Sequence, residues 1–340
     1  MKAPGENQVT PERLMQFGSA YAPPLIIGAA ARNKVFDTLA DGPKTVEEVA
    51  RATGCSIRGL RAIMNALVGL DLLSKERNKY SLTPESEAFL VSNKPGTLAG
   101  FFPMNMKRLI PLWLKLDEIV RTGRPAESRN QEHPGTEFFT ELVENIIPAS
   151  YASAQALADH LKLAAAKQPT RVLDVAAGSG IWGIALAQKS PQVRVTAMDW
   201  AGMIPTTKRI TQKFGVADRF KFIEGDIGEA DFGSGYDIAT LGHILHSEGK
   251  ERSRHLLKKT FGALKPGGTI AIGDWLVNDE RTEPLPALIF AVTMLVNTEE
   301  GDTFSFKEIK NWLEEAGFKN ARTLEAPGPS PLILATKPSD

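Results

Sequence analysis

The feature that most constrains the fold of this chain is the segment 171–187, which reads RVLDVAAGSGIWGIALA. Residues 172–175 are typical of a buried strand, a turn of small residues follows, and a helix is expected from Ile181. Gly178 and Gly180 allow the backbone to approach a ligand closely, and free amide groups at the helix start favour a carboxylate or phosphate there. The order of strand, glycine turn and helix therefore predicts a cradle for a nucleotide-like ligand.

The rest of the chain after residue 171 alternates between strand and helix patterns. Further strands are expected at 193–198, 220–223, 236–241 and 269–275, with a terminal antiparallel pair at 319–324 and 331–336. Such alternation predicts an α/β domain with a mostly parallel, Rossmann-like sheet and helices on both faces.

Three acidic residues accompany the glycine turn. Asp174 lies within the first strand, Asp199 ends the second, and Asp226 is expected to end the third. A carboxylate can accept hydrogen bonds from two neighbouring hydroxyls, so Asp199 is suited to hold a ribose. The turn also spells GxGxxG, a pattern of dinucleotide sites. The positions of Asp174 and Asp226 favour a different cofactor over NAD.

Together these acids and the turn resemble the class I S-adenosylmethionine (SAM) methyltransferases. The cofactor-binding residues are then Asp174, Gly178, Gly180, Asp199, Trp200, Asp226 and Ile227. In that resemblance the glycines pass the methionine part of SAM, Asp199 binds both ribose hydroxyls, and Asp226 with Ile227 borders the adenine. The resemblance implies SAM as the cofactor and S-adenosylhomocysteine as its product.

The first 95 residues read as a mostly helical winged-helix domain. A helical pattern covers 23–41, Thr45 and Ser56 are expected to cap two further helices, and 72–82 reads as a hairpin. A winged helix can bind DNA, here through Arg58 and Arg61, or serve as a dimerisation module.

The charge balance favours dimerisation over DNA binding. The chain has 40 Lys and Arg against 40 Asp and Glu, so no net field attracts nucleic acid or an anionic membrane. We expect a homodimer formed through this domain, including the aliphatic run 25–35, and neither nucleic acid nor membrane as a partner. Residues 96–168 are expected to be a helical linker, kinked at Pro103 and Pro111, that roofs the site in the domain 169–340.

Two histidines, His243 and His246, follow the fourth strand at the predicted ligand edge. A histidine with a pKa of about 6.5 can take the proton of a phenol as the phenol oxygen is methylated. The winged-helix front, the DVAAGSG turn, and the stretches ILHSEGKE, LKPGG and MLVNTEEGDTFS resemble the small-molecule O-methyltransferases of plant phenylpropanoid and bacterial polyketide metabolism.

This second resemblance implies roles for particular residues. His246 falls at the general base, with His243 as the second choice, and Asp274 falls where a carboxylate orients the base. Asp302 is a weaker candidate for a second supporting acid. The positions that border the acceptor are Met294 and Asn297.

The chain also departs from the family pattern. Glycines common in the turn are replaced by Ala176 and Ala177, which is tolerable if both keep negative φ. Gly242 stands where plant members have a lysine near SAM, and Thr303 where they have a glutamate. Ser247 and Glu248 replace an Asp-Trp pair after the base.

The sequence thus predicts a SAM-dependent O-methyltransferase acting on a hydroxyl of a small aromatic or polyketide-like acceptor. Two alternatives remain: a SAM-binding enzyme of a non-methylating, for example pericyclic, reaction, and a DNA-binding regulator that senses SAM. The single cysteine, Cys55, and an N-terminus without an apolar core fit a cytoplasmic protein. No metal site is expected. Acceptor identity, regiochemistry and the choice among O-, N- and C-transfer stay open.

Overall fold

The computed structural model describes residues 9–339. Residues 1–8, which belong to the N-terminal stretch without an apolar core, and residue 340 lie outside the described residues. The chain divides into two compact units after Leu109. Helix α7 (Phe101–Arg108) belongs to the N-terminal unit and the helices after it to the C-terminal unit, so the predicted linker 96–168 does not form a unit of its own.

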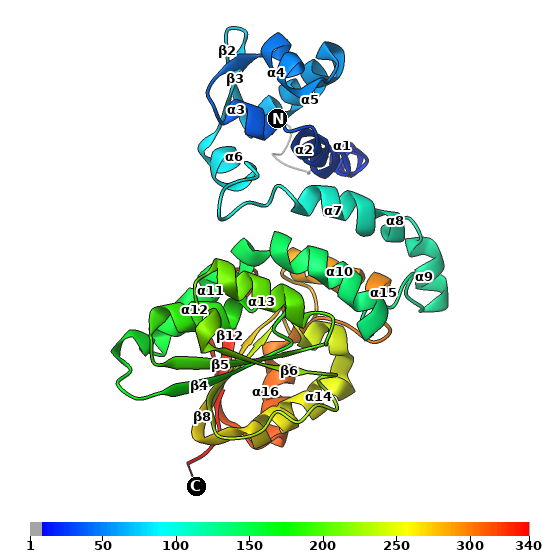
Figure 1. Cartoon of the computed structure of the whole chain (residues 1–340). Coiled ribbons are helices and arrows are strands. Elements are labelled where there is room, and N and C mark those ends of the chain that lie inside the picture. Colours follow the sequence, from blue (N-terminus) through cyan, green and yellow to red (C-terminus); the bar gives the residue numbers. More distant parts are fainter. Residues whose placement is uncertain (1–8, 340) are drawn as a thin grey trace, which may run out of the picture. The chain divides into compact units, whose positions relative to one another are not determined.

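The N-terminal unit has the expected winged-helix elements (Figure 1). Its helices are α1 (Glu12–Phe17), α2 (Ala22–Arg32), α3 (Val35–Leu39), α4 (Val46–Thr53), α5 (Ile57–Gly69) and α6 (Pro84–Phe89), and its strands are β1 (Lys44–Thr45), β2 (Leu73–Glu76) and β3 (Lys79–Leu82). The three strands pair antiparallel in the order β1-β3-β2.

Local chemistry explains where these helices begin. Thr45 forms a reciprocal capping box with Glu48 at the start of α4, and the Ser56 hydroxyl accepts a hydrogen bond from the Gly59 N–H at the start of α5. The pattern over 23–41 predicts one helix, but the structure has two, because Lys34 has a left-handed φ of 55° between them.

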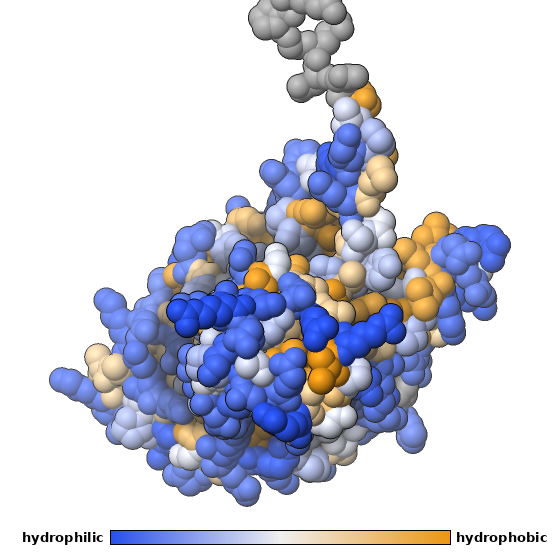
Figure 2. Space-filling view, turned by 90° about the horizontal axis from the view of Figure 1, so that it is seen from above, coloured by the Kyte–Doolittle hydropathy of each residue, from blue (hydrophilic) through white to orange (hydrophobic). Residues whose placement is uncertain are grey.

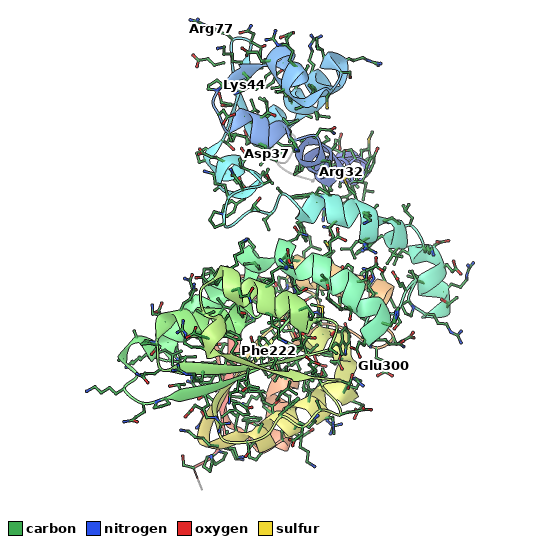
Figure 3. The ribbon with its side chains drawn as sticks, viewed as in Figure 1. Arg32, Asp37, Lys44, Arg77, Phe222 and Glu300 are labelled. Carbon is green, nitrogen blue, oxygen red and sulfur yellow. The ribbon has the colours of Figure 1, made fainter. Side chains whose placement is uncertain are left out.

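The aliphatic run 25–35 serves mainly the core of its own unit. Ala30 and Val35 are buried there, and Gly28 packs so closely on Met106 of α7 that a side chain would collide with its sulfur. Asp37 of α3, labelled in Figure 3, accepts hydrogen bonds from the backbone N–H and the hydroxyl of Ser92. Leu25, Ile26 and Ile27 are only partly buried, and the contribution of this run to a partner interface stays a prediction.

The most exposed large apolar side chains of α1 and its neighbourhood form a group, and Ile57, Leu70 and Phe89 are exposed elsewhere in the unit. Leu14, Met15, Phe17 and Tyr21 are all exposed. On the face drawn in Figure 2, hydrophilic side chains predominate and apolar ones gather in small groups between them. A short helix that exposes several large apolar residues is typical of a partner surface.

The C-terminal unit begins with a run of helices. They are α8 (Ile110–Trp113), α9 (Leu116–Thr122), α10 (Glu132–Asn145), α11 (Ile147–His160) and the 3-10 turn η1 (Leu163–Ala165). The break before α8 comes just ahead of Pro111, as expected. Pro103, in contrast, lies in the first turn of α7 and does not break it, since a proline is tolerated there.

The described residues of this unit form the predicted Rossmann-like sheet. Its seven strands lie in the order β11-β12-β8-β7-β4-β5-β6. They are β4 (Thr170–Val175), β5 (Val193–Asp199), β6 (Phe220–Glu224), β7 (Tyr236–Gly242), β8 (Leu264–Gly273), β11 (Lys319–Leu324) and β12 (Leu332–Thr336). Strands β4 to β8 are parallel, and the terminal pair is antiparallel as predicted.

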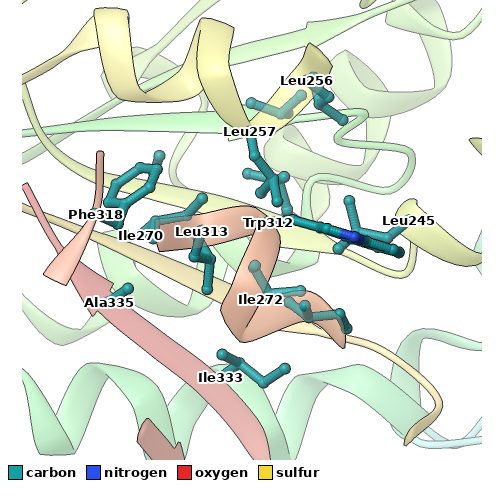
Figure 4. Packing of buried hydrophobic residues seen from close by; sticks show 14 of the residues in the cluster. Leu245, Leu256, Leu257, Ile270, Ile272, Trp312, Leu313, Phe318, Ile333 and Ala335 are labelled. Atoms are coloured by element: carbon teal, nitrogen blue, oxygen red, sulfur yellow. The ribbon is translucent and has the colours of Figure 1, made fainter. Parts of the chain in front are cut away.

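Helices cover both faces of this sheet (Figure 1). α11, α12 (Ile181–Lys189) and α13 (Ile204–Lys213) pack on one face, and α14 (Leu245–Ala263) and α16 (Phe306–Glu315) on the other. Figure 4 shows Trp312 and Leu313 of α16 packed against Ile270 and Ile272 of β8. The remaining elements are η2 (Ala217–Arg219), β9 (Leu276–Val277), α15 (Leu285–Asn297) and β10 (Phe304–Ser305).

None of the helices in the described part of the chain combines the length and apolar character that a membrane span requires.

Candidate functional site

The glycine turn between β4 and α12 has the backbone conformation that its glycines allow. Gly178 and Gly180 have φ of 55° and 73°, in the left-handed region. Ala176 also lies there, with φ of 52°, so the condition that it keeps a negative φ is wrong. An alanine in this region is strained by about 1 to 2 kcal/mol. Ala177 is not among the residues with positive φ.

Gly178 is the point at which several elements meet. Its N–H donates to the Asp199 carboxylate at 2.7 Å, and its carbonyl accepts a hydrogen bond from the Thr207 hydroxyl of α13 at 2.7 Å. A Cβ at this position would lie 3.1 Å from Val143 of α10. The turn is thus held by β5 and α13, and α10 lies directly against it.

Asp199, at the end of β5, is a buried carboxylate with two backbone partners. Besides Gly178 it accepts a hydrogen bond from the N–H of Trp200 at 2.8 Å. Burial raises its pKa to about 6, and the two backbone donors partly oppose that rise. Since a carboxylate has about four lone-pair positions, two remain to accept further hydrogen bonds.

Asp174 lies deeper and serves the protein itself. It is 0 % exposed, and its two oxygens accept from the Gly183 N–H at 3.0 Å and the Thr240 hydroxyl at 2.6 Å. Burial raises its pKa to about 7, against these hydrogen bonds. Asp174 therefore joins α12 and β7 behind the turn. Thr240 and Thr207 could not be predicted as part of the site, because single hydroxyl residues carry no distinctive sequence pattern.

The remaining cofactor candidates lie around the ends of β5 and β6. β6 ends at Glu224, so Asp226 stands in the following loop rather than in the strand. Its carboxylate accepts from the Gly228 N–H at 2.7 Å, and Ile227 beside it is buried. Trp200 packs against Phe139 of α10, with 6.1 Å between ring centres.

His246 and Asp274 form the central pair of the second cluster. Ring atom Nδ1 of His246 lies 2.6 Å from Oδ1 of Asp274, and the His246 backbone N–H donates to Oδ2 at 3.2 Å. Burial opposes ionisation of Asp274, but the charge and hydrogen bond of His246 hold the pKa of that carboxyl below its usual range. Because Asp274 accepts at Nδ1, the neutral ring carries its proton there and leaves Nε2 as an acceptor.

An aromatic side chain lies against the His246 ring. Phe290 of α15 meets it edge to face with 4.8 Å between centres, and Trp275 stacks on Phe290 at 4.6 Å. Met294 and Asn297 follow Phe290 by four and seven residues and so share its side of α15. The Oδ1 atom of Asn297 is buried without a hydrogen-bond partner in the described structure. Met294 and Asn297, the residues predicted to border the acceptor, therefore lie on the side of α15 whose Phe290 contacts His246.

Asp302 contributes its backbone rather than its carboxylate. The Asp302 N–H donates to the carbonyl of His246 at 2.9 Å. Its carboxylate pairs with Arg281 at 3.0 Å. The prediction of a second acid supporting the base is therefore corrected: the side chain holds Arg281, and the loop backbone holds His246.

His243, directly after β7, is a strained and desolvated residue. Its φ is 61°, and its Nδ1 is buried without a partner in the described structure. Burial lowers its pKa to about 4, so it is neutral at physiological pH. A neutral ring is compatible with a role as a base, but no carboxylate is hydrogen-bonded to this ring in the described structure. The geometry therefore favours His246.

Trp182, which sequence analysis missed, explains a departure from the family pattern. A Cβ at Gly242 would overlap its indole ring, and one at Gly273 would lie 2.7 Å from it. The indole thus fills the space beside the ends of β7 and β8, where a side chain at 242 would lie. Two glycines ending adjacent strands were the available signal for a bulky neighbour.

Among the described residues, no group of three or more His, Cys, Asp or Glu side chains is arranged to hold a metal ion.

Comparison with known families matches both units. Residues 128–319, more than half of the chain, match the O-methyltransferase domain, and residues 15–92 match the O-methyltransferase dimerisation domain. The second match covers the winged helix. It agrees with the prediction that this domain serves dimerisation.

Individual relatives extend over nearly the whole chain. The tetracenomycin polyketide synthesis 8-O-methyl transferase TcmO of Streptomyces glaucescens is 27% identical over 330 residues, covering 96% of this chain and 97% of its own. An O-methyltransferase candidate from Nostoc punctiforme has a crystal structure with a TM-score of 0.86 at 26% identity, covering 97% of this chain and 100% of its own.

Human N-acetylserotonin methyltransferase, crystallised with SAM, has the same fold. Its TM-score is 0.83 at 22% identity, and the match covers 98% of this chain and 99% of that one. With a catalytic-domain match over most of the C-terminal unit and a dimerisation-domain match over the N-terminal one, the chain belongs to the O-methyltransferase family.

Proposed function

We propose that this O-methyltransferase uses SAM to methylate a hydroxyl of a small aromatic or polyketide-like metabolite, with His246 as the general base. The observation that carries the proposal is the pairing of His246 with Asp274, which immediately follows β8 in the same parallel sheet as the glycine turn and Asp199. In such sheets ligands bind outside the carboxyl ends of the strands, so both clusters face one crevice.

The residues present fit SAM. Gly178 and Gly180 place no side chain at two positions of the turn, and Asp199 retains lone pairs for two ribose hydroxyls. Asp226 and Ile227 would border the adenine. When bound, SAM supplies an electrophilic methyl group on a sulfonium centre. Asp174 would act indirectly, because its two oxygens already accept hydrogen bonds from Gly183 of α12 and Thr240 of β7.

The contact with Asp274 leaves His246 able to act as a base. With the ring proton on Nδ1, Nε2 of His246 can accept the proton of an acceptor hydroxyl. Asp274 fixes this tautomer and stabilises the imidazolium that forms. Placing the hydroxyl close to the methyl donor contributes more than the proton transfer itself.

The acceptor side is apolar with one polar group. Phe290 and Trp275 offer aromatic faces, and Met294 can adapt to a flat ligand. The buried Oδ1 of Asn297 can accept a hydrogen bond from a second hydroxyl of the acceptor. TcmO acts in polyketide synthesis, which is consistent with an aromatic polyketide acceptor here.

The functional unit is proposed to be a homodimer formed through the N-terminal unit. The match to a dimerisation domain and the exposed Leu14, Met15 and Phe17 on α1 support this assembly. Light scattering should give the mass of a dimer for the wild type. Replacement of Phe17 by Glu should raise the dissociation constant of the dimer, and a monomeric wild type would refute the assembly.

Calorimetric titration with SAM, and with NAD in parallel, followed by mass spectrometry of a phenolic acceptor panel, tests the proposal. We expect SAM binding, no NAD binding, and a product heavier by one methylene group. SAM binding without any methylated product would favour the non-methylating alternative, and NAD binding would overturn the cofactor assignment.

A further inference from the structure

The helix that carries His246 is interrupted three residues after it. Gly249 has φ 70° and ψ −179°, a conformation restricted to glycine, so the turn Leu245 to Glu248 is not continuous with the rest of α14. The break is braced locally. The Ser253 hydroxyl donates to the Leu245 carbonyl at 3.1 Å, which provides a partner for a carbonyl near the break.

The loop after α15 fits against this break. A Cβ at Gly249 would lie 2.7 Å from the carbonyl oxygen of Glu300, which stands at the edge of the C-terminal unit in Figure 3. Two residues on, the Asp302 N–H holds the His246 carbonyl. Because helix continuity is lost, the position of the His246 turn depends on such contacts.

The side chain of Arg252, which lies after the break, contacts both the turn before the break and the Asp226 loop. Nε of Arg252 lies 2.5 Å from Oε2 of Glu248, the last residue of the His246 turn. Its Nη2 lies 3.3 Å from Oδ2 and 3.4 Å from Oδ1 of Asp226, in the loop after β6. A single guanidinium therefore connects the loop expected to border the adenine with the turn that presents the base.

The Glu248 end of this bridge is buried and the Arg252 end is not. The Glu248 side chain is 5 % exposed, against 49 % for Arg252 and 35 % for Asp226. Burial raises the pKa of Glu248, and Arg252 opposes that rise. Removing the guanidinium would leave a buried carboxylate without its counter-charge, two residues from His246.

The geometry points to Arg252 as a positioning residue that couples SAM binding at Asp226 to the placement of His246. This inference rests on the proposed function. An occupied cofactor side would fix the Asp226 loop and, through the same guanidinium, the His246 turn. Coupling of this kind is reciprocal. Loss of the link from Glu248 through Arg252 to Asp226 should therefore weaken both SAM binding and the placement of His246.

The variants that test this are Arg252→Gln and Arg252→Lys, with Arg254→Gln as the matched control. Arg254 lies on the same helix, pairs with Glu251 and Glu315, and is 40 % exposed, but reaches neither cluster. Lysine keeps the charge of Arg252 but has a point charge in place of the planar fork, so it should hold one carboxylate and lose the bridge.

For Arg252→Gln we expect the SAM dissociation constant to rise about 10-fold and kcat to fall about 10-fold, with the acceptor KM within about two-fold. In the ligand-free protein, amide hydrogen exchange should accelerate in 226–228 and 245–249 together. Arg252→Lys should change the same quantities by smaller factors. Arg254→Gln should leave the SAM dissociation constant, kcat and hydrogen exchange unchanged.

The inference fails if Arg252→Gln behaves like Arg254→Gln, or if it lowers Tm while SAM affinity and kcat stay unchanged, since that is a purely structural role. Should the Gln variant not fold, the Lys variant decides by the same criteria. A wild type that binds no SAM would refute the proposed function instead, and the hydrogen-exchange result would still report on the bridge.

Discussion

His246 is joined to Asp274 twice, through its ring and through its own backbone N–H. Oδ1 of the carboxylate lies 2.6 Å from Nδ1, and Oδ2 accepts from the amide at 3.2 Å. The same Oδ1 also accepts from the Trp275 N–H at 2.8 Å. The carboxylate thus fixes where the histidine stands and which ring nitrogen carries the proton, and both must be right for proton transfer from a hydroxyl.

Asp274→Asn should lower kcat about 100-fold or more while SAM affinity changes little. An amide has one acceptor oxygen for three donors, so the ring is free to take the other tautomer. Steady-state kinetics and calorimetry measure the two quantities. His160→Ala, an exposed histidine at the end of α11, serves as the control, and equal kcat for wild type and Asp274→Asn would contradict the assignment.

Asp199→Asn should weaken SAM binding about 10-fold or more, because hydrogen bonds to a charged group are lost. Calorimetric titration of the variant measures the dissociation constant. Asp218→Asn changes an exposed carboxylate after α13 and should leave it unaltered. If both variants bind SAM like the wild type, the ribose does not contact Asp199.

Ala176→Gly should stabilise the C-terminal unit by about 1 kcal/mol, because glycine adopts the left-handed φ of 52° without strain. Ala177→Gly, one residue on, should destabilise it by about 1 kcal/mol, since it adds flexibility and removes a buried methyl group. Urea unfolding followed by tryptophan fluorescence reports on this unit, because all five tryptophans lie after residue 109. Equal effects of the two changes would argue against the turn geometry.

Gly242→Ala should destabilise the fold by about 1 to 3 kcal/mol, because the new methyl group overlaps the Trp182 indole. Gly262→Ala, where nothing lies within 4 Å of the new Cβ on α14, should instead be stabilising. Combining Gly242→Ala with Trp182→Leu should recover part of the loss, and a double variant that shows no recovery would refute the steric explanation.

The stability of the chain relative to Asp174→Asn should fall as pH rises from about 4 to about 7. Burial raises the folded-state pKa of Asp174 from its ordinary 3.8 to about 7, so in this window the folded chain holds a proton that the unfolded chain has released. The contribution is most favourable at low pH, and the difference is at most about 4 kcal/mol. Urea unfolding across this range measures the difference in the free energy of unfolding between the two proteins. If that free energy changed with pH equally in both, Asp174 would not titrate with a raised pKa in the folded chain.

Most of the fold was predictable because its signals are local. Strand alternation, the capping residue Ser56 and the glycine turn each follow from short-range chemistry, and the predicted sheet, winged helix and family are confirmed. The split between α2 and α3 was not predictable, because a lysine at φ 55° has no sequence signal.

The site was less accessible to sequence analysis because it depends on contacts between distant segments. His246 and Asp274 come from a family pattern, and their contact fits it, although their roles stay predictions. The pairing of the Asp302 carboxylate with Arg281, and the filling of the space at Gly242 by Trp182, depend on packing that no spacing rule encodes.

The central claim is tested most directly by transfer of an isotopically labelled methyl group from SAM to phenolic polyketide acceptors, with wild type and His246→Ala compared side by side. We expect a labelled methyl ether from the wild type and an initial rate about 100-fold or more lower for the variant. Equal rates for both proteins, or no labelled product from the wild type, would contradict it.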